Sequence, residues 1–239
     1  MKKKLHYPFW QKIGKANYDY QLIENNDKIA IGLSGGKDSM ALLYALAKLK
    51  QRSPIKYELM AITLELGWKT NLQPAINLCK DLNIPYHIEY TDIGPIVFEY
   101  RKEKNPCSLC AKMKRGALHN AAKRFGFNKV ALAHHLDDAI ETLLLNMFYT
   151  GRIKTFQPKT YLDKKDITLI RPLIYVEEKT IRNFIAEYDI PVIPSGCPAN
   201  GHTKREEIKK LVNDLEKQIP GIRQRLAHSL KNVKREDLW

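Results

Sequence analysis

The chain has 239 residues, of which 44% are hydrophobic and 28% are charged, and these values are typical of a globular protein with a buried core. No apolar run is long enough to cross a membrane, and the first ten residues lack the apolar stretch of a signal peptide. We therefore expect no membrane partner and a cytoplasmic location.

Lysine and arginine (40) outnumber aspartate and glutamate (26), which gives a net charge of +14. Such a surplus is typical of proteins that bind nucleic acids, although a generally basic proteome or a need for solubility could also produce it. The basic residues gather in four segments, which favours a folded RNA as the partner: residues 1–15, 101–124, 152–165 and 204–234.

The first predicted strand, at residues 28–33, runs into the turn SGGKDS at 34–39 and then into an apolar helix at 40–49. Backbone N–H groups at such a helix N-terminus can bind an anion. Gly35 and Gly36 allow positive φ and a close approach to a phosphate. The turn is therefore interpreted as a nucleotide phosphate loop, with an ordinary glycine-rich turn as the alternative.

The spacing within this turn distinguishes it from two common phosphate-binding motifs. A Walker A loop needs a glycine at position 31, where this chain has Ile31, and Ser or Thr after the lysine, where it has Asp38. The dinucleotide-binding G-x-G-x-x-G pattern is also missing from the turn.

Strands and helices are then predicted to alternate, with strands at 55–64, 85–91 and 129–133 and helices at 72–82, 109–125 and 137–149. This alternation predicts a parallel sheet with right-handed crossovers, whose ligands collect at the carboxyl ends of the strands. Ser34 and His134 both follow strand ends, so we expect them to face one crevice.

The pattern changes after Gly151. A hairpin is predicted at residues 154–172, a helix at 177–188, a turn-rich loop at 191–198, and basic helices at 206–217 and 221–233. We predict a basic N-terminal segment (1–25), a nucleotide-binding domain (26–175) and a helical C-terminal extension (176–239) that packs on the sheet.

The four cysteines form the second strong signal. Cys79 lies on the apolar face of its predicted helix and is interpreted as core. Cys107 and Cys110 form a C-x-x-C pair, and Cys197 lies in the turn-rich loop, which leaves three thiols for a metal, a cluster or redox chemistry. Three thiolates with an open fourth position suit a cluster that binds a substrate atom, whereas a structural zinc site would need His119 or His202 as well.

A third signal is the pair Asp137 and Asp138, which follows a predicted strand and opens a helix. Two carboxylates at this position can hold Mg²⁺ or orient a polar group of a substrate. The alternative is a simple capping role, because aspartate is common at helix starts.

Together, SGGKDS, CSLCAKMKRGAL, AHHLDDAIETLLLNMFYTGRIKTFQPK, IRPLIYVEEKTI and the cysteine of IPSGC resemble the TtcA-type tRNA 2-thiocytidine synthetases of the PP-loop ATP pyrophosphatase superfamily. The resemblance covers residues 10–230. Members of that group use ATP and a [4Fe-4S] cluster held by three cysteines to thiolate cytidine 32 of tRNA, and the related TtuA type thiolates a uridine.

The resemblance implies an α/β, Rossmann-like fold of the PP-loop (adenine nucleotide alpha hydrolase-like) class, with a parallel sheet, flanking helices and a small C-terminal extension. It implies ATP with Mg²⁺, tRNA, a sulfur donor (sulfide or a cysteine desulfurase) and a homodimer. The cluster ligands would be Cys107, Cys110 and Cys197, and the catalytic residues Asp38, Lys114, Asp137 and Asp138. The nucleotide would be bound by Leu33, Ser34, Gly35, Gly36, Lys37, Asp38, Ser39, Thr63 and Leu64.

This chain departs from the pattern in two ways. Four cysteines are too few for the two additional zinc modules of the TtuA type, which favours the TtcA side. The turn-rich loop has only Cys197 where the TtcA proteins have a C-x-x-C, so the target base stays open between cytidine and uridine. A cluster-free PP-loop ligase and a non-catalytic RNA-binding or redox-sensing protein are the further alternatives.

Overall fold

The computed structural model describes residues 7–68, 70–101, 106–194, 196–198, 203–234 and 236. Its centre is a six-stranded sheet in the order β3-β2-β1-β4-β6-β5. All neighbouring strands are parallel except β5, which pairs antiparallel with β6 as a hairpin. The strands are β1 (Asp27–Gly32), β2 (Tyr57–Glu65), β3 (Tyr86–Tyr90), β4 (Lys129–Ala131), β5 (Lys159–Leu162) and β6 (Ile167–Ile170).

The helices fill the connections between the strands, as the alternation in the sequence predicts. They are α1 (Tyr7–Tyr20), α2 (Lys37–Arg52), α3 (Gln73–Asp81), the short turns α4 (Ile93–Pro95) and η1 (Ile96–Tyr100), α5 (Pro106–Arg124), α6 (Leu136–Thr150), α7 (Glu178–Glu187), α8 (Lys204–Gln218) and α9 (Ile222–Ser229). The sequence analysis did not predict α1, α4 or η1.

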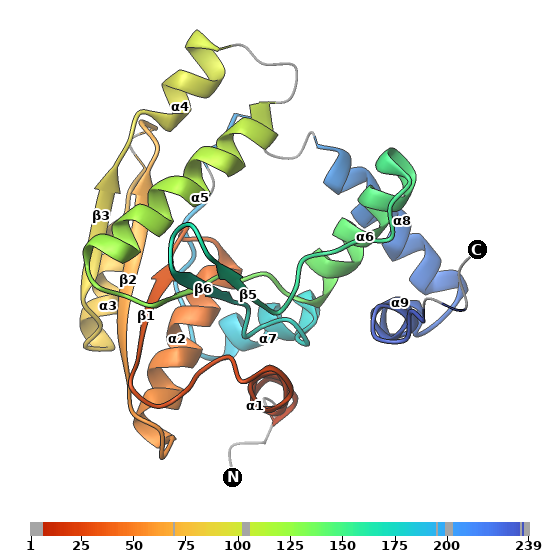
Figure 1. Ribbon diagram of the computed structural model, residues 1–239, viewed down its shortest axis with the longest axis horizontal. Coiled ribbons are helices and arrows are strands. Elements are labelled where there is room, and N and C mark those ends of the chain that lie inside the picture. The colour runs from red at the N-terminus through yellow and green to blue at the C-terminus, as the bar shows by residue number, and fades with distance from the viewer. Residues whose placement is uncertain are drawn as a thin grey trace.

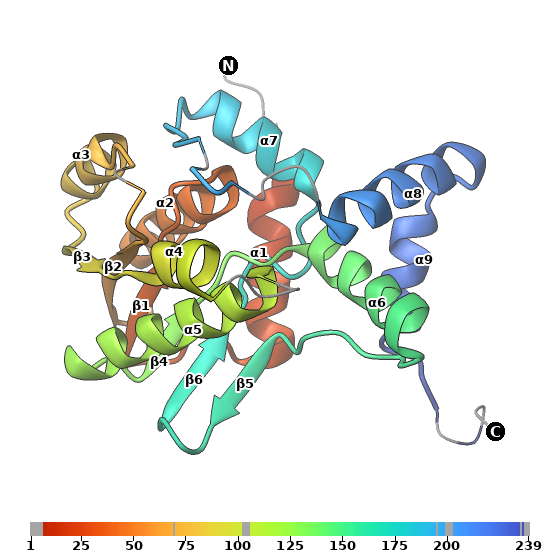
Figure 2. The same ribbon diagram turned by 90° about the horizontal axis from the view of Figure 1, so that it is seen from above.

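Residues that alternate along the central strands separate the core into two layers. Ile29 and Ile31 of β1 pack in the larger core with α2 and α3, whereas Ala30 packs in a second core with Leu118 and Ala122 of α5. This is the period of two that a strand buried on both faces requires. In Figure 2, α2 and α3 lie on one side of the sheet and α5 lies on the other.

Helix α1 joins the larger core through its packing on α7. The rings of Phe9 and Phe184 stack with centroids 3.8 Å apart, and both side chains are fully buried. Residues from the two ends of the chain thus share one apolar core. The division of the chain at residues 25 and 175 stays a prediction.

The helices α6, α8 and α9 form a separate group beside the sheet (Figure 1). Ile140 and Leu144 of α6 pack against Ile208 and Val212 of α8 in a small apolar cluster. Helix α6 ends at Gly151, whose φ of +64° is the left-handed conformation common after a helix C-terminus. None of the helices in the described ranges combines the length and apolar character needed to span a membrane.

Candidate nucleotide and thiol site

The turn between β1 and α2 has the open geometry that an anion site requires. Gly35 has φ +82°, and a Cβ at this position would lie 2.8 Å from Cβ of Ile193. Gly36 is the N-cap of α2 and provides no side-chain hydrogen bond to the first N–H groups of the helix. These donors therefore remain available to an anion such as a phosphate.

Two hydroxyls hold the turn in shape. Ser39 Oγ accepts a hydrogen bond from the Ser34 N–H (3.2 Å) and donates one to the Gly36 carbonyl oxygen (3.0 Å). Ser34 Oγ lies 3.1 Å from Ser39 Oγ and accepts a hydrogen bond from the Gly36 N–H at 3.4 Å. The predicted serines are thus used in part to order the backbone around the anion site.

The charged pair at the start of α2 has a third partner from far along the chain. Lys37 Nζ lies 3.0 Å from Asp38 Oδ2 and 2.9 Å from Glu178 Oε1, at the start of α7. Burial lowers the pKa of Lys37, but the carboxylates of Asp38 and Glu178 raise it by more, so the ammonium stays charged. Glu178 also accepts hydrogen bonds from Arg182 (2.7 Å) and Lys209 (3.1 Å). Burial raises the pKa of Glu178, but Lys37 and Lys209 lower it by more, to about 2.

Asp38 has one carboxylate oxygen that is suited to a cation. Its Oδ1 is buried and has no hydrogen-bond partner among the described residues, and His135 Nε2 lies 3.7 Å away. A buried carboxylate oxygen beside a phosphate loop is a chemically appropriate ligand for Mg²⁺, which binds carboxylates together with substrate phosphates.

The two aspartates of α6 have different environments. Asp137 accepts hydrogen bonds from the Glu178 N–H (2.7 Å) and from Arg223 Nε (2.9 Å), so it joins α6 to α7 and α9. Asp138 forms a capping box with His135, and its Oδ2 lies 3.5 Å from His135 Nε2. His135 therefore lies within 3.8 Å of Asp38 and of both aspartates of α6.

Helix α8 adds a cation that the sequence analysis did not single out. Arg205 NH1 lies 3.4 Å from Asp138 Oδ1 and 3.2 Å from Glu141 Oε2. Glu141 is buried, and burial together with the charge of Asp138 raises its pKa to about 7. No local motif marks Arg205, Lys209 or Arg223, because each reaches its partner across more than 30 positions of sequence.

The residues predicted to line the adenine and ribose pocket are mostly packed in the core. Leu33 is 1% exposed in the larger core, and Leu64 packs against the core under α5. The hydroxyl of Thr63 donates to the Leu33 carbonyl oxygen at 2.7 Å and so joins the ends of β1 and β2. Any contact that these side chains make with a nucleotide stays a prediction.

The three predicted cluster cysteines lie near one another. Cys110 is buried beside Ile93 and Val97, Cys107 is exposed and Cys197 is partly buried. Burial raises the pKa of Cys110, the charge of Lys114 lowers it, and Cys197 and Cys107 raise it further. Both other thiols and the exposed Lys114 therefore act electrostatically on the Cys110 thiol.

The donor set matches an iron–sulfur cluster in its chemistry, because thiolates are the ligands of such clusters and two of the three thiols lie in the first turns of α5. In the described part of the chain, these thiols are not drawn together into a group of three or more His, Cys, Asp or Glu side chains that could hold a metal ion. His119 follows Cys110 by nine residues on α5. At 1.5 Å per residue it lies about 13 Å further along the helix axis and does not complete a site with Cys110. His202 lies outside the described residues.

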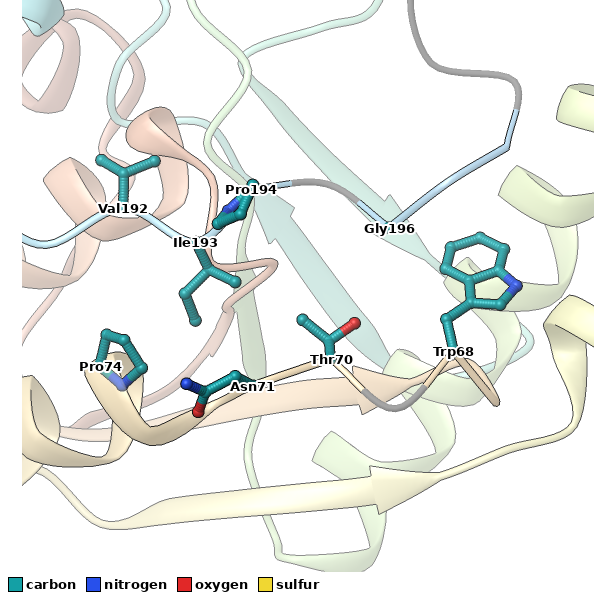
Figure 3. Close-up of a pocket in the computed structure, with 8 residues that line it drawn as sticks. All are labelled: Trp68, Thr70, Asn71, Pro74, Val192, Ile193, Pro194 and Gly196. Atoms are coloured by element: carbon teal, nitrogen blue, oxygen red, sulfur yellow. The ribbon is translucent and has the colours of Figure 1, made fainter.

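A cavity of about 370 Å³ lies between the segment that follows β2 and the loop that follows α7. Figure 3 shows its walls, which come from the segment after β2 and from the loop after α7: Trp68, Thr70, Asn71, Pro74, Val192, Ile193, Pro194 and Gly196. Ile193 donates its backbone N–H to the Gly35 carbonyl oxygen at 2.8 Å, and Gly196 precedes Cys197. One loop thus joins the phosphate loop to a thiol.

Comparisons with known proteins match most of the chain. The PP-loop domain family matches residues 7–214. The tRNA-cytidine(32) 2-sulfurtransferase of Geobacter sulfurreducens is 42% identical over 225 residues, which cover 92% of this chain and 88% of the relative. The protein of that name from Paraburkholderia phytofirmans is 40% identical over 228 residues, which cover 93% and 67%.

Among solved structures, the U34-tRNA thiolase NcsA from Methanococcus maripaludis with its [4Fe-4S] cluster superposes with a TM-score of 0.81. The match covers 100% of this chain and 84% of that protein at 24% identity, which confirms the predicted fold class. The chain therefore belongs to the PP-loop family and, within it, to the family of the tRNA-cytidine(32) 2-sulfurtransferases.

Proposed function

We propose that this protein is an ATP-dependent tRNA sulfurtransferase that replaces the 2-oxygen of cytidine 32 with sulfur. The observation that carries the proposal is the backbone hydrogen bond between Ile193 and Gly35, because it fixes the loop of Cys197 against the phosphate loop. An ATP-activated base and a thiol-bound sulfur source would thus meet at one edge of the sheet. The relatives named for cytidine 32 support this choice of base over uridine.

The residues around the turn are suited to the first step, in which ATP activates the base. The N–H groups at the start of α2 and the Lys37 ammonium would hold the phosphates, and Asp38 would hold Mg²⁺ through its unpartnered oxygen. The 2-oxygen of the cytosine attacks the α-phosphorus of ATP, and pyrophosphate leaves. The product is a base whose oxygen now departs readily as AMP.

The second step needs a sulfur nucleophile, which attacks C2 of the activated base and expels AMP. Cys107, Cys110 and Cys197 would hold a [4Fe-4S] cluster, which when bound supplies an iron position that can carry sulfide. Lys114, which acts electrostatically on Cys110, and Asp138, beside His135, would assist proton transfer at the base. We further propose sulfide or a cysteine desulfurase as the donor, a homodimer as the assembly and the cytoplasm as the location.

The test is mass spectrometry of nucleosides from tRNA, after expression of this chain in a bacterium that lacks its own 2-thiocytidine synthetase. We expect 2-thiocytidine with the wild-type chain and its loss with Cys107→Ala. Cys79→Ala is the matched control, because Cys79 is a buried core thiol away from the proposed ligands. A different thionucleoside would move the target base, and no thionucleoside from iron-loaded protein would contradict the proposal.

The activation step is tested separately by pyrophosphate release from ATP in the presence of tRNA. Asp38→Asn keeps the size of the side chain but removes the charge that would hold Mg²⁺, so we expect at least a hundredfold slower release (~10²). Asp81→Asn, at the exposed end of α3, should leave the rate unchanged. Equal rates for the two variants would remove Asp38 from the mechanism.

A further inference from the structure

Arg171 is a buried cation at the same edge of the sheet as the phosphate loop. It follows the last residue of β6, and His134 lies just beyond the end of the neighbouring strand β4. Because β4 and β6 are parallel, their carboxyl ends meet at this edge. The two side chains therefore lie where a parallel sheet collects its ligands.

The guanidinium of Arg171 is incompletely satisfied by the protein. The residue is 7% exposed, and its Nε is buried without a hydrogen-bond partner. Within the described ranges, no carboxylate lies within ion-pair distance, and the one side-chain hydrogen bond runs from NH1 to the Gln157 carbonyl oxygen at 2.5 Å. A buried charge without a counter-charge is costly, and such residues normally have an anionic partner.

An aromatic side chain lies between Arg171 and His134. Cζ of Arg171 lies 4.9 Å from the ring centre of Phe156, and the His134 ring lies 4.9 Å from the same ring on a tilt of 41°. His134 Nδ1 is also buried without a hydrogen-bond partner. The three side chains thus form a cluster that combines a cation, an aromatic ring and a polar nitrogen without a hydrogen-bond partner.

Charged groups of both signs act on Arg171 and His134. Arg115 of α5 acts electrostatically on both Arg171 and His119, and Lys165 acts on His119. Burial and the charge of Arg115 lower the pKa of Arg171 to about 10, so the guanidinium remains charged at neutral pH. Arg115 and Arg205 therefore favour a negatively charged ligand beside Arg171 and His134, and Asp138 opposes one on the His134 side.

We propose that Arg171 binds a backbone phosphate of the RNA substrate next to the target nucleotide, with Phe156 and His134 supporting that nucleotide. This inference rests on the proposed function. A phosphate of ATP would have the same chemistry, but β4 lies between β1 and β6, so Arg171 is two strands from the phosphate loop. At the usual strand spacing this is about 10 Å, which favours the RNA as the source of the anion.

The experiment measures binding of a synthetic RNA hairpin, with the sequence of a tRNA anticodon stem and loop, as a function of salt concentration. For Arg171→Gln we expect about tenfold weaker binding and a slope of log K against log salt that falls by about 0.7, the value for one phosphate contact on a single strand. Arg171→Lys keeps the charge and should keep the slope. A role limited to holding the Gln157 loop would weaken binding without changing the slope.

Arg52→Gln is the matched control, because Arg52 ends α2 at the opposite edge of the sheet and is exposed. It removes the same charge and should change neither affinity nor slope beyond about twofold. The fold of each variant is checked by its thermal unfolding midpoint. If Arg171→Gln does not fold, Arg171→Lys is tested with hairpins that carry a neutral methylphosphonate at one position at a time. Both the wild type and Arg171→Lys should lose affinity at the same single phosphate, and an equal response at every position would overturn the contact.

The outcomes separate the two proposals. If the wild-type protein does not bind the hairpin, the proposed function itself is contradicted. If the wild type binds, and Arg171→Gln keeps the full slope, the phosphate contact is wrong while the proposed function stands. If Arg171→Gln weakens ATP binding and leaves hairpin binding unchanged, the anion belongs to the nucleotide and the RNA assignment is overturned.

Discussion

At Gly35, the absence of a side chain allows both the backbone conformation of the phosphate loop and its close contact with the loop that leads to Cys197. Its φ of +82° is strained for any other residue type, and the nearest side chain, Ile193, belongs to the loop that leads to Cys197. A methyl group here would therefore push the backbone and this loop apart. The glycine is needed both for its conformation and for close packing between two segments of the site.

We predict that Gly35→Ala lowers ATP affinity by at least tenfold (~10-fold) and lowers the free energy of unfolding by about 2 kcal/mol. Gly126→Ala is the control, because Gly126 also has positive φ (+75°) but open space around its Cβ position. It should cost about 1 kcal/mol and leave ATP binding intact. Calorimetric titration and urea unfolding would measure both effects, and equal ATP affinities would contradict the role of the close contact.

Glu141 gives a pH-dependent prediction, because burial and the charge of Asp138 raise its pKa to about 7 in the fold. The folded chain then binds a proton more tightly than the unfolded chain, whose glutamate keeps a pKa near 4.5. From this group, the free energy of unfolding falls as pH rises from about 4.5 to about 7. Glu141→Gln should therefore gain stability relative to the wild type over this window.

Urea midpoints at about pH 4.5 and pH 8 would measure the change, since they bracket the two pKa values. The exposed Glu99→Gln is the control and should show no such trend relative to the wild type. A difference between Glu141→Gln and wild type that stays constant with pH would show that Glu141 is already ionised in the fold.

At the scale of elements, the contact between α1 and α7 ties the start of the chain to the segment that carries Glu178. Phe9 is fully buried and stacks on Phe184, and Ile13 and Ala16 continue the same apolar face of α1. The carboxylate of Glu177, just before α7, also pairs with Lys12 at 3.0 Å. Helix α1 therefore contributes to the position of α7 and, through it, of Glu178.

Phe9→Ala should lower the free energy of unfolding by about 3–5 kcal/mol, because it removes a large ring from a closed core. Tyr18→Ala, on the same helix but 86% exposed, should change it by less than about 0.5 kcal/mol. Chemical unfolding monitored by circular dichroism would give both values. A small loss for Phe9→Ala would mean that α1 is dispensable for the core.

The sequence predicted most of the elements that have a clear apolar period, but it missed α1. The strands at β1, β2 and β3 and the helices α2 and α6 follow from apolar periodicity and from Gly151 as a helix end. Helix α1 had a usable signal, the spacing of Phe9, Ile13 and Ala16, but its basic composition concealed it. The contacts of Arg205, Lys209 and Arg223 had none, because they depend on how α8 and α9 dock.

For the whole molecule, the net charge of +14 has a measurable consequence for the proposed substrate. Binding of a polyanion releases condensed counterions, so affinity falls steeply with salt in proportion to the number of phosphates contacted. We predict that tRNA affinity falls at least a hundredfold (~10²) when salt rises about fourfold from a low starting value. ATP affinity, measured under the same conditions as the control, should fall by less than about tenfold.

Filter binding of labelled tRNA would measure this dependence. A flat response would show that the positive charge serves some purpose other than RNA binding.

The location of the candidate site at the edge of a parallel sheet was predictable at this scale, because strand order and the carboxyl-end rule require no side-chain detail. The close approach of the loop after α7 to Gly35 was not predictable, because it joins residues 158 positions apart.

The Lys37 ammonium already holds two carboxylates, from Asp38 and Glu178, before any nucleotide arrives. A nucleotide phosphate that binds Lys37 must therefore displace one or both of these carboxylates from the ammonium. A triphosphate offers more phosphate oxygens to Lys37 and to the N–H groups of α2 than AMP does, so we expect it to compete better than AMP. We therefore expect the internal carboxylates to favour release of AMP once sulfur has been transferred.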